Sequence, residues 1–453
     1  MKGLTQLGFQ TFVSLCYKAY GLDVFGMHKW LLKTMYWSPW QRLEWRLQRL
    51  GNILEFAWNH VPFYREYWGD HRVDFRRPQA MEELQRYPIL TKDVFRANAA
   101  RIQPDSLSSI RHRRWHTGGT TGQPVQYLRD LEQWTLAEAF HLWGWSQVGY
   151  VFGDPVGVIA GGSLIPERLG LESRVRGWMH RRLFLYGVAM DRSIAREYHE
   201  RLCKHGAKLL YGYPSVLYLF GKNLAEQGLN LPRLKAVITT AEMLFPNYRE
   251  SIERTFSCRV FDNLGCNDGG YESYECQQHN GFHYNDLQSV LEVDHVKTSG
   301  KGRLIITNLW NKSNPFIRYE NGDMITLASQ PCPCTCPFPL ISSVQGKTHD
   351  ILTFANGRSL SGPALALIFR EMEIDGWQVV QTDSSRLEVR ICCSSGLKPE
   401  YSDHIHKILR HYLTDEVEIA IKQVEKLETT KGGKLKSIWS EVGRKFDADS
   451  QSG

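Results

Sequence analysis

Apolar residues near the start of the chain recur at helical spacing. Within 41–66 they occupy the i, i+3, i+4 and i+7 positions that align along one face of a helix: Leu50, Ile53, Leu54, Ala57, Trp58 and Val61. We predict helical structure here, with this face in the core. Residues 131–147 predict another helix, which Asp130 would cap. The moderately apolar first 20 residues are interrupted by polar ones, so we interpret them as an amphipathic helix and not as a signal peptide.

Short apolar segments alternate with helical ones between about 150 and 270. Strands are predicted at 156–160, 208–211, 234–239 and 259–262, and helices at 214–227 and 248–256. Strands that alternate with helices favour a largely parallel α/β sheet. After residue 280 the pattern becomes rich in strands, and 287–293 and 302–309 predict a smaller sheet.

The pattern changes again past residue 350. It predicts a helix at 361–372, a hairpin that turns at 383–385, a helix at 405–413 and a strand at 417–421. We therefore divide the chain into an N-terminal domain, a small α+β domain and a disordered polar tail. Their bounds are 1–347, with a helical lead-in over 1–44, then 348–443 and 444–453.

Composition narrows the class of protein. The 453 residues exceed what one core usually holds, and 42% hydrophobic and 23% charged residues are typical of a soluble globular protein. The net charge of +7 suits an anionic ligand such as a nucleotide. The basic run 111–114 is too short for a nucleic-acid site, and we interpret it as a solvated loop. No apolar stretch is long enough for stable membrane insertion, so the expected compartment is the cytoplasm.

The sharpest local motif is a run of threonines and glycines at 117–124. Its glycines allow tight turns that expose consecutive N–H groups to an anion, and its threonines add hydroxyl donors. No Gly-Lys-Ser/Thr follows, so this is not a Walker loop. The motif predicts a phosphate site, and the alternative is a plain Gly/Thr loop. The residues are Thr117, Gly118, Gly119, Thr120, Thr121, Gly122, Gln123 and Pro124.

This octet resembles the phosphate loop of the adenylate-forming enzymes, which include acyl- and aryl-CoA ligases, luciferases and nonribosomal adenylation domains. From about residue 45 to 440 the chain resembles the phenylacetate–CoA ligase and CapK-like branch, with its motifs in the expected order. The resemblance implies the α/β adenylate-forming fold: a large N-terminal domain and a small, mobile C-terminal α+β domain.

Two motifs match segments that line the nucleotide site in that family. Ala241 and Glu242 fall where the family borders the adenine pocket, and the alternative is a helix N-terminus capped by Thr240. At 263–268 the family usually has Tyr-Gly-x-Thr/Ser-Glu, with an aromatic ring on adenine and a glutamate on Mg²⁺. This chain has Asn263, Leu264, Gly265, Cys266, Asn267 and Asp268, so Leu264 replaces the aromatic and Asp268 the glutamate.

Three later residues match charged positions of the family. Asp323 ends a match to Arg-Tyr-x-x-Gly-Asp, whose aspartate holds the ribose hydroxyls; the alternative is an acidic turn. Lys347 replaces the hinge arginine, before a hinge aspartate at Asp350. Lys434 matches the lysine that reaches the α-phosphate and the carboxylate, and a surface lysine cluster is the alternative.

Cysteine and histidine spacing predicts a metal site. Cys276 and His283 lie seven residues apart, and Cys332 and Cys334 form Cys-Pro-Cys. Thiolates and imidazole suit tetrahedral zinc, and four protein ligands would make it structural. Some members of the branch bind zinc at matching points. Free thiols without a metal are the alternative, and Cys336 and His279 are reserve ligands.

The resemblance implies that ATP activates a carboxylic acid as an acyl-adenylate. Lys434, Thr120 and Asp268 would be catalytic, with Mg²⁺ on Asp268, and coenzyme A would be the acceptor. One alternative is transfer to another thiol or amine in cell-surface polysaccharide biosynthesis. A second is a degenerate nucleotide-binding or scaffold protein, suggested by Leu264 and Asn267. No nucleic-acid partner is expected, and a homodimer is compatible with the sequence.

Overall fold

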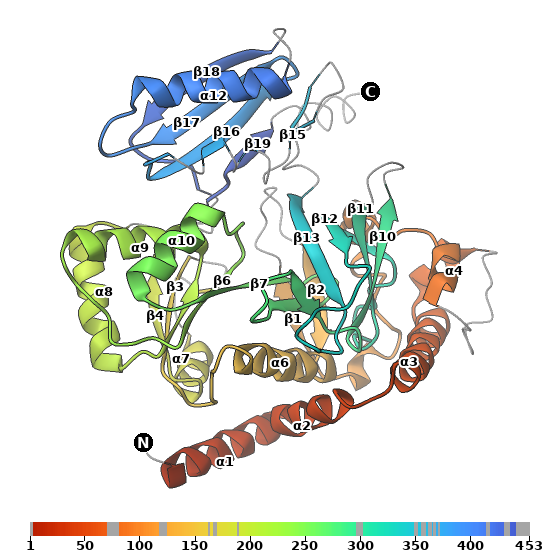
Figure 1. Cartoon of the computed structure of the whole chain (residues 1–453). Coiled ribbons are helices and arrows are strands. Elements are labelled where there is room, and N and C mark those ends of the chain that lie inside the picture. The colour runs from red at the N-terminus through yellow and green to blue at the C-terminus, as the bar shows by residue number, and fades with distance from the viewer. Residues whose placement is uncertain are drawn as a thin grey trace. The chain divides into compact units, whose positions relative to one another are not determined.

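The computed structural model divides the chain into two compact units (Figure 1). Unit 1 comprises Met1–Asp154, Val175–Arg181 and Phe261–Val344, and unit 2 comprises Pro155–Arg174, Arg182–Val260 and Gln345–Gly453. The residues that the structure describes are 3–69, 81–116, 125–161, 164–165, 170–187, 190–295, 302–347, 352–354, 359–360, 365, 368–369, 372–413, 417–429 and 435–440.

Helices account for most of the first 150 residues of unit 1. They are α1 (Gly3–Tyr20), α2 (Val24–Thr34), α3 (Pro39–His60), α4 (Pro62–Trp68), α5 (Lys92–Asn98) and α6 (Leu131–Ser146), with 3₁₀ turns η1 (Met81–Arg86) and η2 (Leu107–Ser109). Asp130 accepts a hydrogen bond from the Gln133 N–H at 2.8 Å, which confirms the predicted cap of α6.

The helical periodicity predicted over 41–66 is confirmed, but it is divided between two helices that meet at Val61. Pro62 has no N–H to continue the helical bonds and is favoured at a first helical position, so it ends α3 and begins α4. Phe63 and Tyr64 are buried after this break. The apolar periodicity therefore continues through Val61, although the helix is interrupted there.

The strands of unit 1 form a hairpin and one side of a large sheet. The hairpin pairs β1 (His112–His116) with β2 (Gln126–Asp130). Most of the basic run 111–114 is therefore strand, and its interpretation as a solvated loop is wrong. The sheet strands lie in the order β10 (Ser289–His295), β11 (Gly302–Asn308), β12 (Tyr319–Leu327), β13 (Leu340–Lys347), β9 (Phe282–Tyr284), β8 (Tyr271–Glu275) and β7 (Val260–Cys266).

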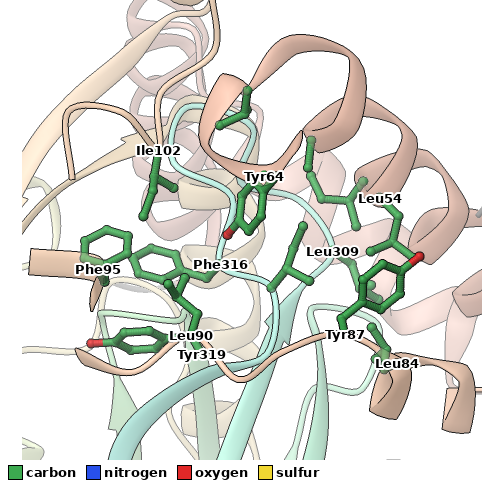
Figure 2. Packing of buried hydrophobic residues seen from close by; sticks show 14 of the residues in the cluster. Leu54, Tyr64, Leu84, Tyr87, Leu90, Phe95, Ile102, Leu309, Phe316 and Tyr319 are labelled. Carbon is green, nitrogen blue, oxygen red and sulfur yellow. The ribbon is translucent and has the colours of Figure 1, made fainter. Parts of the chain in front are cut away.

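A buried aromatic cluster joins α3, α4 and α5 to this sheet (Figure 2). The rings of Phe95 and Phe316 stack with centroids 4.7 Å apart, and the Tyr319 ring packs 5.0 Å from Phe316. Leu90 forms a β-bridge with Tyr319 immediately before α5. The cluster therefore fixes both the first residue of β12 and the N-terminus of α5.

Unit 2 contains the predicted parallel α/β arrangement. Its strands lie in the order β6 (Ala236–Thr240), β5 (Leu209–Gly212), β3 (Val156–Ala160) and β4 (Arg182–Tyr186), and the pairs of β5 with β6, β3 with β5 and β3 with β4 are parallel. Helices α8 (Arg192–His205), α9 (Pro214–Glu226) and α10 (Pro246–Phe256) alternate with them, and α7 (Leu171–Met179) precedes β4.

The end of the chain forms a smaller sheet within unit 2. Its order is β18 (Glu418–Val424), β17 (Arg386–Cys392), β16 (Gly376–Asp383) and β19 (Ile438–Ser440), and α12 (Pro399–Tyr412) buries Ile405 and Leu409. The predicted hairpin is confirmed as β16–β17. A short pair, β14 (Leu352–Thr353) and β15 (Ser359–Leu360), precedes it. Most of the helix predicted at 361–372 lies outside the described residues.

Contacts inside unit 2 attach this sheet to α9 and α10. The Trp377 ring packs 5.0 Å from Phe245, Lys222 forms an ion pair with Asp375, and the Tyr218 hydroxyl donates to the Ile374 carbonyl at 3.2 Å. Burial alone would raise the pKa of Asp375, but hydrogen bonds from Lys222 and Ser394 lower it overall. The carboxylate therefore stays ionised in this pair at neutral pH.

Candidate nucleotide site and metal centre

The segment 263–268 lies at the end of β7 and in the turn that leads to β8. The two strands pair antiparallel, with Asn263 opposite Tyr274 and Cys266 opposite Tyr271. Gly269 and Gly270 close the turn with φ of 89° and 72°, a conformation that glycine adopts without steric cost. A Cβ on Gly270 would lie 2.5 Å from Asn308 Nδ2, so this turn also requires glycine for space.

The candidate ligands of this segment differ in exposure. Asn263 is buried, and its side-chain amide donates to the Ser273 carbonyl at 2.8 Å. Leu264 is partly buried and packs against an apolar cluster that includes Tyr271 and Ile306. Gly265 and Asn267 are exposed. The backbone of this segment is therefore held firmly, while two of its residues remain open to solvent.

Asp268 is only 4% exposed and accepts from three donors. Lys92 Nζ lies 3.1 Å from Oδ2, the Tyr319 hydroxyl donates to Oδ2 at 2.8 Å, and the Cys266 thiol donates to Oδ1 at 2.9 Å. A buried carboxylate needs such partners to remain charged. Lys92 is a residue of this group that the sequence reasoning missed.

Asp323 is another buried carboxylate of unit 1 and lies on β12. Its Oδ2 accepts from Asn321 Nδ2 at 2.5 Å and from the Tyr271 hydroxyl at 3.4 Å. Burial, and then the neighbouring carboxylates, raise the pKa of both Tyr271 and Tyr319 well above the usual value. Both phenols therefore remain protonated donors at neutral pH, and each is directed at one of the two aspartates.

Glu242 lies in unit 2, in the connection between β6 and α10. Thr240 ends β6 and Ala241 has a φ of 71°, while α10 begins only at Pro246. The alternative in which Thr240 caps the following helix is therefore wrong. Glu242 instead meets the N-terminus of α9, where its Oε2 accepts from the Ser215 hydroxyl at 2.6 Å and from the Ser215 N–H at 3.2 Å. A carboxylate is stabilised there by the helix dipole.

The other oxygen of Glu242 binds a segment near the C-terminus of the chain. Oε1 accepts from the Leu435 N–H at 2.6 Å, and Leu435 forms a β-bridge with Thr429. Leu435 directly follows Lys434, which itself lies outside the described residues. Unit 2 therefore holds the backbone next to the predicted catalytic lysine against the predicted adenine-pocket residue.

Several predicted site residues fall outside the part of the chain that the structure describes. These are Asp350, Lys434 and the phosphate-loop residues Thr117, Gly118, Gly119, Thr120, Thr121 and Gly122. Lys347 is described only in its backbone, as the last residue of β13. Their predicted roles stay predictions.

The four predicted zinc ligands come together in unit 1. The ligand atoms of Cys276, His283, Cys332 and Cys334 all lie within 4.8 Å of one another. Sγ of Cys276 is 3.7 Å from Sγ of Cys332, and Sγ of Cys334 is 3.2 Å from Nε2 of His283. The other ring nitrogen, Nδ1, hydrogen-bonds the Phe338 carbonyl at 2.8 Å, so Nε2 is directed at the sulfurs.

The reserve ligands do not belong to this group of four. His279 Nδ1 pairs with Glu275 at 3.1 Å, and its ring stacks on Phe261. Burial raises the pKa of Cys336 to about 12. Burial likewise raises the pKa of Cys334 to about 12 and lowers that of His283. Cys334 therefore favours its protonated thiol, and His283 its neutral imidazole, when no cation is bound.

Known proteins resemble this chain over most of its length. It is 21% identical over 399 residues to protein CapK of Staphylococcus aureus, an alignment that covers 85% of this chain and 86% of that protein. It is 23% identical over 410 residues to phenylacetate–coenzyme A ligase of Thermus thermophilus, covering 86% and 88%. No family model matches the chain.

A solved structure agrees in fold. 2-Hydroxyisobutyryl-CoA ligase in its postadenylation state superposes with a TM-score of 0.68 and 20% identity, covering 90% of this chain and 92% of that one. The chain is thus similar over most of its length to CapK and to phenylacetate–CoA ligase, and it has the fold of the adenylate-forming superfamily. Its fold class is the α/β architecture of that superfamily, with the small α+β sheet near the C-terminus.

Proposed function

We propose that this protein uses ATP to activate a carboxylic acid as an acyl-adenylate and then transfers the acyl group to coenzyme A. Two relatives are named phenylacetate–coenzyme A ligase, one of them matched over 86% of this chain. The observation that carries the proposal is Asp323. It is a buried carboxylate held by Asn321 and Tyr271 at the position whose family counterpart binds the ribose hydroxyls.

The remaining roles follow from the chemistry of each group. The N–H groups and hydroxyls at 117–124 would bind the ATP phosphates. Lys434 would stabilise the charge that develops as the substrate carboxylate attacks the α-phosphate. The C-terminal residues would rotate about Asp350 between this step and thioester formation.

Asp268 is not suited to hold Mg²⁺ in the arrangement that the structure shows. Its oxygens already accept from Lys92, Tyr319 and Cys266, so a metal bound there would have to replace at least one donor. We therefore place no step on Mg²⁺ at Asp268. The Lys92 ammonium, with Nζ 3.1 Å from Oδ2, supplies the positive charge at this carboxylate.

The direct test is ATP–pyrophosphate exchange with a panel of aryl, fatty and amino acids. Exchange with at least one acid is expected for the wild type. Lys434→Ala should lower the rate on the order of 10²–10³-fold, because it removes one transition-state donor. Lys431 lies three residues away and provides a matched control. The Lys431→Ala variant should keep the wild-type exchange rate. Absence of exchange with every acid, together with absence of ATP binding by calorimetry, would overturn the proposal in favour of a scaffold role.

The acceptor is tested separately, because transfer of the acyl group to another thiol or to an amine is the alternative to coenzyme A. Once the activating acid is known, the enzyme is supplied with ATP, that acid and either coenzyme A or a panel of amines and amino sugars. Thioester formation, measured as loss of free coenzyme A thiol, supports the ligase. Amide formation without thioester would assign transfer to an amine and leave the adenylation step intact.

We further propose that Cys276, His283, Cys332 and Cys334 bind structural zinc. Ligands 2.3 Å from a tetrahedral zinc ion lie roughly 3.7 Å apart, and the Cys276–Cys332 sulfur separation is 3.7 Å. The hydrogen bond of His283 Nδ1 to a backbone carbonyl is the usual orienting contact of a zinc-bound histidine. Zinc there would take four protein ligands and leave no open position, so its role is to hold β8, β9 and the 332–334 loop together.

A further inference from the structure

Helix α1 exposes an apolar face. At 100° per residue, its exposed positions fall within an arc of about 140°: Leu7, Gly8, Thr11, Phe12, Leu15, Lys18 and Ala19. Leu7 is 65% exposed and Leu15 is 62% exposed. The opposite side carries the buried Val13 and Tyr17. The helix is therefore apolar on both sides, although only one side packs against the protein.

A tryptophan from α7 extends this face within unit 1. The Trp178 ring meets Phe12 edge-on with centroids 6.0 Å apart and Phe9 with centroids 5.9 Å apart, and yet Trp178 is 59% exposed. Leu7, Phe12, Leu15 and Trp178 thus form one exposed group, which we call the α1 face. Contiguous apolar groups of this kind mark interaction sites on soluble proteins.

Large side chains are also exposed at the next turns of the chain. Tyr36 is 91% exposed and Trp40 is 71% exposed, and Leu32 on α2 is also exposed. Figure 1 shows α2 following α1 beside α6, within unit 1. Tyrosine and tryptophan are the side chains that concentrate at the boundary between water and lipid, because each combines an apolar ring with a polar group.

Positive charges predominate in this region. Residues 1–41 contain four lysines, namely Lys2, Lys18, Lys29 and Lys33, against a single acidic residue, Asp23. Lys18, Lys29 and Lys33 are exposed. A helix face of leucine and phenylalanine bordered by lysines is complementary to a lipid surface with anionic headgroups. A partner protein would need to match the same positive border with acidic residues.

We propose that the α1 face docks on an anionic lipid surface, with its leucine and phenylalanine side chains among the acyl chains and the lysines at the headgroups. The helix lies in the interface and does not cross it, since none of the described helices is long and apolar enough to span a bilayer. Docking would bring the enzyme to acids or acceptors that partition into lipid. The proposal is independent of the reaction proposed above.

Vesicle co-sedimentation of the full chain tests this surface. Vesicles of phosphatidylcholine with about 30% phosphatidylglycerol should bind the protein, and salt should weaken binding by screening the lysines. The triple variant Leu7→Gln, Phe12→Gln, Leu15→Gln should bind about tenfold more weakly. Lys29→Gln with Lys33→Gln should lower binding to anionic vesicles but not the weaker binding to phosphatidylcholine alone.

Two controls separate docking from misfolding. Tyr186→Gln removes an exposed aromatic from unit 2 and should bind vesicles like the wild type. The triple variant should keep its far-UV circular dichroism and its ATP–pyrophosphate exchange. Equal binding by the wild type and the triple variant, or binding by neither, would overturn the proposal. A dimer that sedimentation velocity detects in the wild type and not in the triple variant would assign the α1 face to a second copy of the chain instead.

Discussion

Two polar clusters of unit 1 differ in how their buried polar groups are stabilised. At the Cys276–His283–Cys332–Cys334 cluster, three thiols and an imidazole face one another, and the thiols would become better metal ligands on losing their protons. At Asp268 a carboxylate faces the ammonium of Lys92 and two hydrogen-bond donors. In our proposal a bound cation completes the first cluster, whereas the second contains the Lys92 ammonium. Side chains that can bind a metal therefore predict a metal site only where no lysine or arginine already pairs with them.

The largest expected effect is at the cysteine cluster. Cys332→Ser should abolish zinc binding and lower the free energy of unfolding by roughly 4 kcal/mol, because loss of a structural metal removes the link between β8, β9 and the 332–334 loop. Zinc content is measured by plasma mass spectrometry and stability by urea unfolding. Cys336→Ser is the matched control and should change neither. The metal site would be contradicted if the wild-type protein contained no zinc and unfolded with the same free energy as both variants.

A smaller effect is expected from the pair formed by Lys92 and Asp268. Lys92→Met leaves a carboxylate that is 5% exposed without its cation, and Asp268→Asn leaves a cation that is 25% exposed without its anion. Each change should cost roughly 2–4 kcal/mol of unfolding free energy, with Lys92→Met the more costly.

The double variant decides whether the two residues act as a pair. Its cost should fall below the sum of the single costs by roughly 1–2 kcal/mol, which is the coupling expected of neighbouring charges. Additive costs would show that Lys92 is not the cation of this site. Addition of Mg²⁺ to the Lys92→Met variant sharpens the comparison, because a site that has lost its own cation should then gain stability from the metal.

The smallest effects concern the two tyrosines. Tyr319→Phe removes a hydrogen bond of 2.8 Å to Asp268 and should cost about 1–2 kcal/mol. Tyr271→Phe removes a contact of 3.4 Å to Asp323 and should cost less than about 1 kcal/mol. Both are measured by urea unfolding, with ATP affinity by calorimetry as the second readout. The reverse order of costs would mean that Asp323, and not Asp268, depends more on its phenol.

Sequence reasoning succeeded where the determinants of a feature are local. Asp130 lies three residues from the N–H that it accepts, and the apolar alternation of β16 and β17 lies on either side of a polar turn. The four candidate zinc ligands were also predictable, because clustered cysteine and histidine have few other uses in a protein of this kind.

It failed where a partner comes from a distant segment. Lys92 meets Asp268 only because Leu90 pairs with Tyr319, and nothing in the local pattern around either residue indicates that pairing. For Glu242 the sequence predicted a border of the adenine pocket, with a helix N-terminus capped by Thr240 as the alternative, but it indicated no contact with the start of α9. Its actual partner, Ser215, begins a different helix.

The hydrogen bond from the Leu435 amide to Glu242 provides an internal reporter. An amide proton bound in this way exchanges with solvent deuterium only when the bond opens. Because Leu435 adjoins Lys434 in the sequence, its exchange rate would report, without a label, how often the Leu435 backbone separates from Glu242. Slowing or acceleration of this single signal by ATP, acid or coenzyme A would order the steps of a catalytic cycle in time.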